Sequence, residues 1–318
     1  MEAEGVEEVL KVVDTCLARI KWRLRPSSKR RLETDILALC TRLRPVIMVD
    51  YGGKMPELQE HLCKLLDLAQ KETSILQALR IMVIEDMIYL IHAREFAEYV
   101  LSTLSSEIHM RFVDLEQDPP KLLPQEEQHS VLTDLVSIQN LFSTIFHVEQ
   151  TNKNFASDVP LPSVLPETKS SQYVPCSSHD GEPIASQSSK CIDLSSCMQG
   201  SQVTIPTLNG WLLGYPVVYL FSKERIADAI CSLSTKYLHL FQIVVCRDQK
   251  SNKKAIQEEL MSFSVPYDLS MEGKTSCGLR LFSLGCWLKL INASTCGKIC
   301  GWRSVSATHN PSRCSNSV

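Results

Sequence analysis

Residues 45–54 read Pro-Val-Ile-Met-Val-Asp-Tyr-Gly-Gly-Lys, and this stretch decides the expected fold. Its apolar, β-branched half predicts a short buried strand that ends at Asp50. Gly52 and Gly53 then break the chain, and Pro56 marks the start of a helix whose leucines recur at helical spacing. A strand that passes through a glycine turn into a helix is typical of α/β proteins.

The alternation of strands and helices continues on both sides of this stretch. Four further apolar runs predict strands: residues 80–84, 109–113, 217–221 and 238–245. Helical periodicity lies between them, and a last helix is predicted to carry Ile256, Leu260 and Met261. Because parallel strands are connected by crossover helices, this order predicts an α/β fold with a mainly parallel sheet and helices on both faces.

Composition divides the chain into four parts. Residues 1–150 form a first α/β part, and residues 206–270 form a second part of the same domain. Between them, residues 151–205 are rich in Ser and Pro and lack apolar periodicity, which predicts a disordered insert. Residues 271–318 read as an irregular, basic, Cys-rich tail.

Charge and targeting signals narrow the class of protein. The chain has 33 basic and 36 acidic residues, a net charge of -3, so no overall field favours nucleic acid. No apolar run is long enough for a membrane helix, and the acidic N-terminus fits no secretory or mitochondrial signal. We therefore expect a cytoplasmic or nuclear protein, in which the 13 cysteines are reduced.

Cys63 is expected on the apolar side of its helix, where a thiolate is disfavoured.

The turn after the first strand holds the first candidate site. Gly52 and Gly53 are candidate cofactor-binding positions, because their backbone amides can approach a phosphate at the start of a helix. Asp50 and Lys54 are the candidate catalytic residues, with Lys54 paired to the phosphate. Asp50 also resembles the strand-end aspartate of haloacid-dehalogenase phosphatases, although their second aspartate is replaced here by Gly52. The alternative is a plain strand–turn–helix connection in which Asp50 acts as a cap.

Carboxylates follow two other predicted strands. Asp86 lies after the second strand and Asp114 at the end of the third. If these strands are neighbours, Asp50, Asp86 and Asp114 converge and are the candidate ligands of a Mg²⁺ ion, which prefers oxygen ligands. The alternative is that each acid caps a helix and faces solvent.

Two other clusters suggest further hypotheses. In the tail, Cys296 and Cys300 have the spacing of a zinc-ligand pair, with Cys314 and His309 as loose partners. Between residues 21 and 31 lie six basic side chains, which suit nuclear import or an anionic surface. A solvated basic turn between two helices is the favoured interpretation of that segment.

One segment carries a resemblance to a known family. Residues 208–221, Leu-Asn-Gly-Trp-Leu-Leu-Gly-Tyr-Pro-Val-Val-Tyr-Leu-Phe, resemble the signature of the eukaryotic family named for the human chromosome 1 open reading frame 74 protein. The segments PVIMVDYGGK and FSVPYDLS are compatible with it. The family is a domain of unknown function, so the resemblance implies no activity and no cofactor. It covers roughly residues 1–270.

Together these patterns favour a binding or interaction protein without established catalysis. Its partner is expected to be another protein, which the sequence does not identify. The alternative is a phosphate- or Mg-dependent hydrolase or phosphotransfer enzyme that uses the strand-end carboxylates. Convergence of Asp50, Asp86 and Asp114 in the fold distinguishes the two hypotheses.

Overall fold

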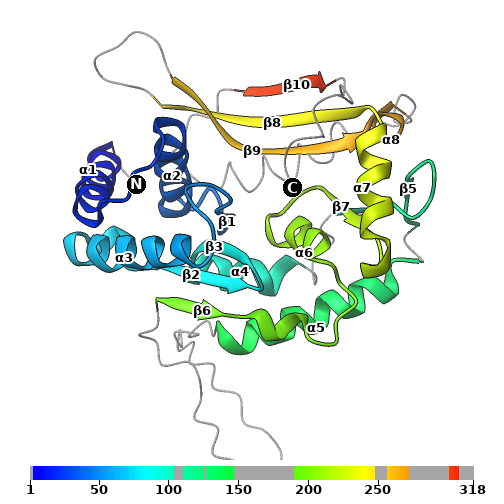
Figure 1. The fold of residues 1–318 in the computed structure, drawn as a ribbon, viewed down its shortest axis with the longest axis horizontal. Coiled ribbons are helices and arrows are strands. Elements are labelled where there is room, and N and C mark those ends of the chain that lie inside the picture. The colour runs from blue at the N-terminus through cyan, green and yellow to red at the C-terminus, as the bar shows by residue number, and fades with distance from the viewer. Residues whose placement is uncertain are drawn as a thin grey trace, which may run out of the picture.

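The computed structural model describes residues 3–103, 110–124, 127–146, 190–247, 256–271 and 301–307 (Figure 1). Its first sheet has four strands in the order β1-β3-β2-β6. These strands are β1 (Val46–Met48), β3 (Met87–His92), β2 (Leu79–Ile84) and β6 (Cys191–Asp193). The apolar run of residues 45–49 therefore forms β1, as predicted.

Helices cover both faces of this sheet, and the alternation of side chains along each strand explains why. On one face, Ile81 and Leu90 pack with α1 (Ala3–Ile20), α2 (Pro26–Cys40) and α3 (Glu57–Glu72). On the other face, Met82 and Tyr89 join a second core. That core is shared with α4 (Ala93–Thr103), α5 (His129–Ile145) and α6 (Ile205–Leu212). The α/β class with helices on both faces is thus confirmed.

The prediction of a mainly parallel sheet is wrong, because β2 and β3 form a hairpin. Only residues 80–84 were predicted as a strand here, but a two-residue turn at Glu85 and Asp86 joins β2 to a second strand, β3. Glu85 adopts a φ of 55°, which this tight turn requires although the residue is not glycine. Strand β3 pairs antiparallel with both β1 and β2, and β6 is parallel to β2.

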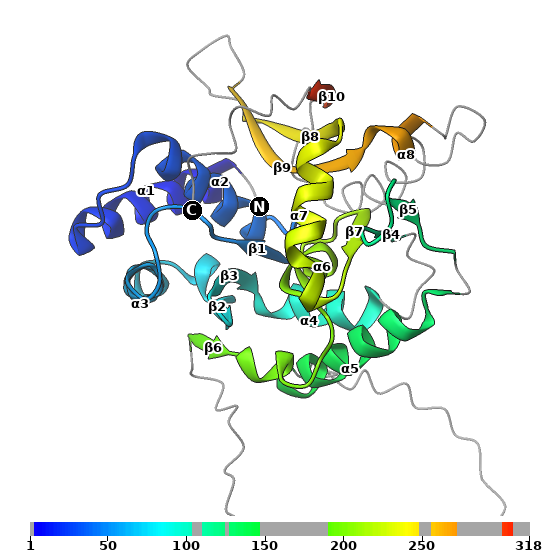
Figure 2. The ribbon, with the colours of Figure 1, turned by 45° about the vertical axis from the view of Figure 1, so that its right-hand side comes forward.

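Two three-stranded sheets complete the part of the fold that the structure describes. The first has the order β5-β4-β7, formed by β5 (Lys121–Leu122), β4 (Arg111–Asp114) and β7 (Val217–Leu220). In it, β4 pairs parallel with β7 and antiparallel with β5. The other, antiparallel sheet is formed by β10 (Gly301–Ala307), β8 (Leu238–Arg247) and β9 (Ile256–Pro266). Figure 2 shows it on the opposite side of the molecule from α5, with α7 (Ile226–Thr235) and α8 (Tyr267–Met271) nearby.

Strand β9 replaces the helix predicted for Ile256, Leu260 and Met261. From Met261 onward its buried side chains alternate along the strand, at Phe263 and Val265. The register between β8 and β9 shifts beside Met261, so the adjacent Leu260 is buried as well. A bulge of this kind places two neighbouring residues on the core side and imitates helical spacing in the sequence.

Part of the predicted insert belongs to the fold. Residues 190–205 include β6, a 3₁₀ turn over Ser195–Met198 and the start of α6. Leu194, Met198 and Val203 are buried, so this end of the insert contributes to the second core. Residues 151–189 lie outside the described part of the chain. So does most of the predicted tail, including the zinc candidates Cys296, Cys300, His309 and Cys314.

Replacing Gly52 by alanine is expected to lower the free energy of unfolding by about 2–4 kcal/mol. Gly52 has a φ of +87°, and an added Cβ would lie 2.8 Å from Leu24 Cδ2 and 3.0 Å from the Trp22 ring. Gly200→Ala is the matched control, because Gly200 has a φ of +74° but no atom lies within 4 Å of the place that its added Cβ would take. Urea unfolding followed by circular dichroism measures both losses, and equal losses would show that only the backbone conformation matters.

Candidate functional site

The turn after β1 has a structural role at Gly52. The Gly52 carbonyl accepts a hydrogen bond from Trp22 Nε1 at 2.9 Å, and the Trp22 and Leu24 side chains occupy the space beside its Cα. Asp50 and Lys54 are exposed, as is Gly53. Leu58 N donates to the Lys54 carbonyl at 2.8 Å, which joins the turn to the start of α3.

Two of the candidate metal ligands, Asp50 and Asp86, lie at the same end of the β1-β3-β2-β6 sheet, whereas Asp114 lies in another sheet. Asp50 follows β1, and Asp86 lies in the exposed turn between β2 and β3. Asp114 ends β4, which belongs to the β5-β4-β7 sheet. Within the described residues, no group of three or more His, Cys, Asp or Glu side chains could hold a metal ion.

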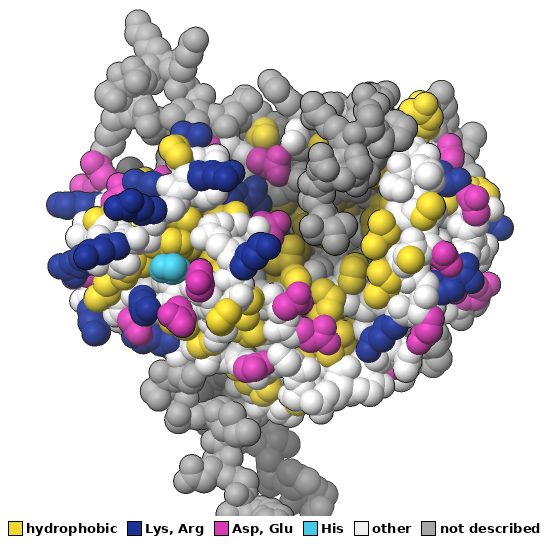
Figure 3. Space-filling view, viewed as in Figure 1, with side chains coloured by type: hydrophobic (Ala, Val, Ile, Leu, Met, Phe, Trp, Pro, Cys, Tyr) yellow, Lys and Arg dark blue, Asp and Glu magenta, His cyan; other side chains and the backbone are white. Residues whose placement is uncertain are grey.

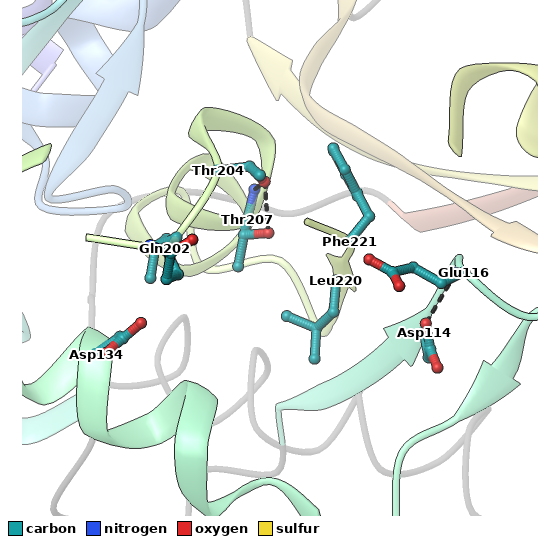
Figure 4. Close-up of a pocket in the computed structure, with 9 residues that line it drawn as sticks. Asp114, Glu116, Asp134, Gln202, Thr204, Thr207, Leu220 and Phe221 are labelled. Atoms are coloured by element: carbon teal, nitrogen blue, oxygen red, sulfur yellow. Dashed lines mark hydrogen bonds between the residues drawn. The ribbon is translucent and has the colours of Figure 1, made fainter. Parts of the chain in front are cut away.

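Asp114 does line a cavity, which we call the β4–β7 pocket. Its volume is about 360 Å³, and it lies where the two parallel strands β4 and β7 end (Figure 4). In α/β proteins, ligand sites commonly form beyond the carboxyl ends of parallel strands. The described lining consists of Asp114, Glu116, Asp134, Gln202, Val203, Thr204, Thr207, Leu220 and Phe221.

The threonines of the pocket are fixed by the first turn of α6. Thr204 is the N-cap residue, and its Oγ1 accepts a hydrogen bond from Thr207 N at 3.4 Å. The Thr204 and Thr207 hydroxyls are 2.9 Å apart, and Thr207 Oγ1 donates to the Tyr219 carbonyl of β7 at 2.7 Å. These bonds attach the start of α6 to β7, so the pocket wall is built from two joined elements.

Two of the carboxylates are held by backbone amides. Glu116 Oε1 accepts a hydrogen bond from Ser222 N at 2.6 Å. Hydrogen bonding from Ser222 keeps the pKa of Glu116 below its usual range, so this side chain is ionised at neutral pH. Asp114 accepts from Glu116 N at 2.8 Å and from Gln117 Nε2 at 2.9 Å. The lining within the described residues has three acidic side chains and no Lys, Arg or His.

The acids stand on opposite sides of an apolar centre. Figure 4 shows Asp134, on α5, across the pocket from Asp114 and Glu116. Leu220 and Phe221, at the end of β7, lie between the two sides. This arrangement suits a ligand that has positive charge and an apolar body, because each part then meets a matching surface.

Most of the pocket lining was not among the residues singled out from the sequence. Asp134 lies on a helix that is recognised in the sequence by its apolar positions, which carry no sign of a site. Gln202 and Thr204 fall within the predicted insert, and Thr207 lies next to it. One signal was present: Thr204 followed by Pro206 is a helix-start pattern, with Thr as the N-cap and Pro in the first turn.

The basic segment 21–31 lies on a different surface. Lys and Arg side chains gather over α1 and α2 in Figure 3, on the side of the molecule away from α7. Lys21, Arg23 and Arg25 are exposed, and Lys29 Nζ forms an ion pair with Asp14 at 2.7 Å. Residues 21–25 join α1 and α2 as a solvated turn, whereas Arg31 lies on α2 and pairs with the buried Asp35 at 3.4 Å.

The fold and the pocket define a mixed α/β protein with an acidic cavity at a pair of parallel strand ends. None of the helices in the described parts of the chain is both long and apolar enough to cross a membrane. Residues 14–278 match the family described as domain of unknown function DUF4504, and the chain belongs to this family. No curated protein and no solved structure matches the chain.

Proposed function

We propose that this protein is a binding protein whose β4–β7 pocket takes an organic cation. The observation that carries the proposal is the pair of facing acidic walls, Asp134 on one side and Asp114 with Glu116 on the other. An ammonium or guanidinium group forms charge-assisted hydrogen bonds with carboxylates, which are stronger than bonds between neutral groups. The cation can belong to a small amine or to a basic side chain of a partner protein.

The size and the apolar centre of the pocket narrow the ligand class. A volume of about 360 Å³ is at the small end of ligand-binding pockets. Leu220 and Phe221 provide the surface on which an aliphatic stem packs, as the stems of Lys and Arg do elsewhere. A ligand with two cationic ends, such as a short diamine or an aminoalkyl guanidine, meets both acidic walls.

Isothermal titration of the full chain with putrescine, agmatine and L-arginine tests the proposal. Binding of at least one of them is expected, and it should weaken as salt is raised because the interaction is electrostatic. Asp134→Asn and Glu116→Gln are each expected to weaken binding about tenfold or more, since each removes a hydrogen bond to a charged group.

Glu98→Gln is the matched control. Glu98 is an exposed acid on α4 that pairs with Arg94 outside the pocket lining, so its neutralisation changes net charge equally. Binding by Glu98→Gln should match that of the unchanged protein. If no cation binds, or if Asp134→Asn binds as well as the unchanged protein does, the proposal is wrong.

A phosphate- or Mg²⁺-dependent hydrolase is the second candidate. It rests on the exposure of Asp50 and Lys54 beside the start of α3. A thermal-shift titration with Mg²⁺ and nucleotides separates it from the first candidate. A stabilisation that disappears in Asp50→Asn and persists in Asp134→Asn would favour the turn after β1 over the pocket.

Two finer inferences rest on the sequence alone. We infer that this chain belongs with the proteins named for the human chromosome 1 open reading frame 74 protein, because residues 208–221 resemble their signature. We also infer a cytoplasmic or nuclear location, in which the natural partner would be encountered; fluorescence microscopy of the tagged full chain tests it.

A further inference from the structure

Two cysteines far apart in the sequence meet between α3 and β6. Cys63 lies in the middle of α3, and Cys191 is the first residue of β6. Their thiols are hydrogen-bonded to each other, and Gln59 Nε2 donates to Cys191 Sγ at 3.3 Å. Both side chains are partly exposed, so a small oxidant can reach them.

The two cysteines are held in place by the contacts on either side of them. Gln59, Cys63 and Asp67 are four residues apart and share one face of α3. Asp67 Oδ1 pairs with Lys190 Nζ at 2.5 Å, next to Cys191. The start of β6 is therefore fixed to α3 at two adjacent residues, which keeps the sulfurs together.

Cys191 lies on a short edge strand, so a bond between the two cysteines would affect how that strand is attached. Strand β6 has three residues and lies at the end of the β1-β3-β2-β6 order. Among the described strands it pairs with β2 alone, with Ile81 opposite Cys191 in the register. Such a short edge strand gains little from its few ladder bonds, so a covalent bond to α3 would strengthen its attachment considerably.

We propose that Cys63 and Cys191 form a redox pair, which peroxide converts to a disulfide that locks β6 onto α3. Oxidation and reduction of this pair would then change how firmly the chain is held at the point where it enters β6. The proposal is independent of the cation pocket, which shares no residue with it.

The two thiols differ in acidity, as a reaction between a nucleophilic and a resolving cysteine requires. The hydrogen bond from Cys63 lowers the pKa of Cys191 to about 7, so Cys191 is partly thiolate at neutral pH. The same hydrogen bond, together with burial, raises the pKa of Cys63. Cys191 is therefore the nucleophile that meets the oxidant, and Cys63 is the thiol that resolves the product.

The reaction balances with hydrogen peroxide as the oxidant. The Cys191 thiolate attacks one peroxide oxygen, the O–O bond breaks, and Cys191 sulfenic acid and hydroxide form; the hydroxide takes up a proton to become water. The Cys63 sulfur then attacks the sulfenic sulfur, and the second oxygen leaves as water with the Cys63 proton. Two thiols and one peroxide give one disulfide and two waters, and a dithiol reductant reverses the change.

Mass spectrometry of the full chain tests the proposal directly. The protein is treated with a small excess of hydrogen peroxide, its remaining thiols are alkylated, and it is digested with trypsin and chymotrypsin. The expected product is a reducible peptide that joins a Cys63 fragment from within residues 55–64 to a fragment starting at Cys191. Chymotrypsin cleaves after Leu194 and so separates Cys191 from Cys197.

Variants separate a redox pair from two independent thiols. In Cys63→Ser, Cys191 sulfenic acid has no resolving thiol and should be trapped by dimedone at least fivefold more than in the unchanged protein. Alkylation of Cys191 should rise with pH with a midpoint near 7, and at pH 7 it should exceed that of the buried Cys197 at least tenfold.

Cys231 is the internal control, because it is exposed on α7. The proposal is overturned if Cys231 is oxidised while no peptide joins Cys63 to Cys191. It is equally overturned if dimedone labels Cys191 to the same extent with and without Cys63. The first of these measurements uses the unchanged protein, so it decides the matter even if a variant does not fold.

Discussion

Replacing Arg44 by methionine is expected to lower the free energy of unfolding by about 3–5 kcal/mol. Arg44 precedes β1 and is 3% exposed. Its Nη1 donates to the Leu260 carbonyl of β9 at 3.2 Å, and its Nη2 donates to the Leu213 carbonyl after α6 at 3.4 Å. One side chain thus connects three segments that are far apart in the sequence.

The expected loss has two sources. Without the guanidinium, two buried carbonyls lose a donor, and each unsatisfied polar group costs about 1–3 kcal/mol. Burial raises the pKa of Asp35, and Arg44 is one of the positive charges that oppose this rise, so removing Arg44 leaves the buried carboxylate with less compensating charge. Methionine keeps the aliphatic volume of arginine, so the variant reports mainly on charge and hydrogen bonding.

Arg19→Met is the matched control for Arg44→Met. The Arg19 side chain is 52% exposed and pairs with Glu72 at 2.6 Å, an exposed ion pair that contributes about 0–1 kcal/mol. Guanidinium chloride unfolding at pH 7 measures both variants. Equal losses would mean that the buried contacts of Arg44 contribute no more than a surface pair.

Replacing Trp211 by alanine is expected to cost about 3–5 kcal/mol of unfolding free energy. Trp211 lies on α6 and has no exposed surface. Its ring stacks on Phe142 of α5 with a centroid distance of 6.1 Å, and its carbonyl accepts from Tyr99 Oη at 2.6 Å. Alanine leaves a cavity where α4, α5 and α6 meet, and packed surroundings collapse into it only in part.

Trp211→Phe separates packing from hydrogen bonding. The Trp211 Nε1 group is buried and has no hydrogen-bond partner among the described residues. Phenylalanine removes this unsatisfied donor, which offsets part of the lost volume, so the loss should be at most half that of alanine. Tyr237→Ala is the control: that ring is 65% exposed, and the change should stay within about 0.5 kcal/mol. Equal losses of unfolding free energy for Trp211→Phe and Trp211→Ala would contradict the expectation that removing the unsatisfied Nε1 donor offsets part of the lost packing.

Strands with a clear local signal were predictable from the sequence. Strands β1, β2, β4, β7 and β8 each arise from a short apolar run bounded by polar or turn-forming residues, and each was expected close to its observed bounds. In these segments the local preference and the tertiary packing agree. The helix that follows Pro56 was predicted for the same reason.

Strand direction was harder to predict, because it depends on turns with weak signals. The Glu85-Asp86 turn lacks the Asn-Gly or Asp-Gly pair that usually marks a hairpin, so β2 was predicted but its antiparallel partner β3 was missed. In β9, the bulge beside Met261 gave the sequence a helical spacing. In both places the backbone departs from regular alternation, and the period alone was misleading.

The pocket could be anticipated at Asp114 and Glu116, whose place after a predicted strand is visible in the sequence. Its other polar walls come from Asp134 and from Thr204 and Thr207, which lie on separate helices and are far apart in the chain. The parallel pairing of β4 with β7 brings them together, and no short stretch of sequence encodes that pairing. The same holds for Cys63 and Cys191, which meet because β6 pairs with β2.

The β4–β7 pairing also governs when this protein can fold during its synthesis. Arg111 pairs with Val217, so β4 leaves the ribosome roughly a hundred residues before its parallel partner exists. At a translation rate of about 5–20 residues per second, that interval lasts on the order of 5–20 s. During it, the edge of β4 that later pairs with β7 has no native partner and is open to pairing with another strand.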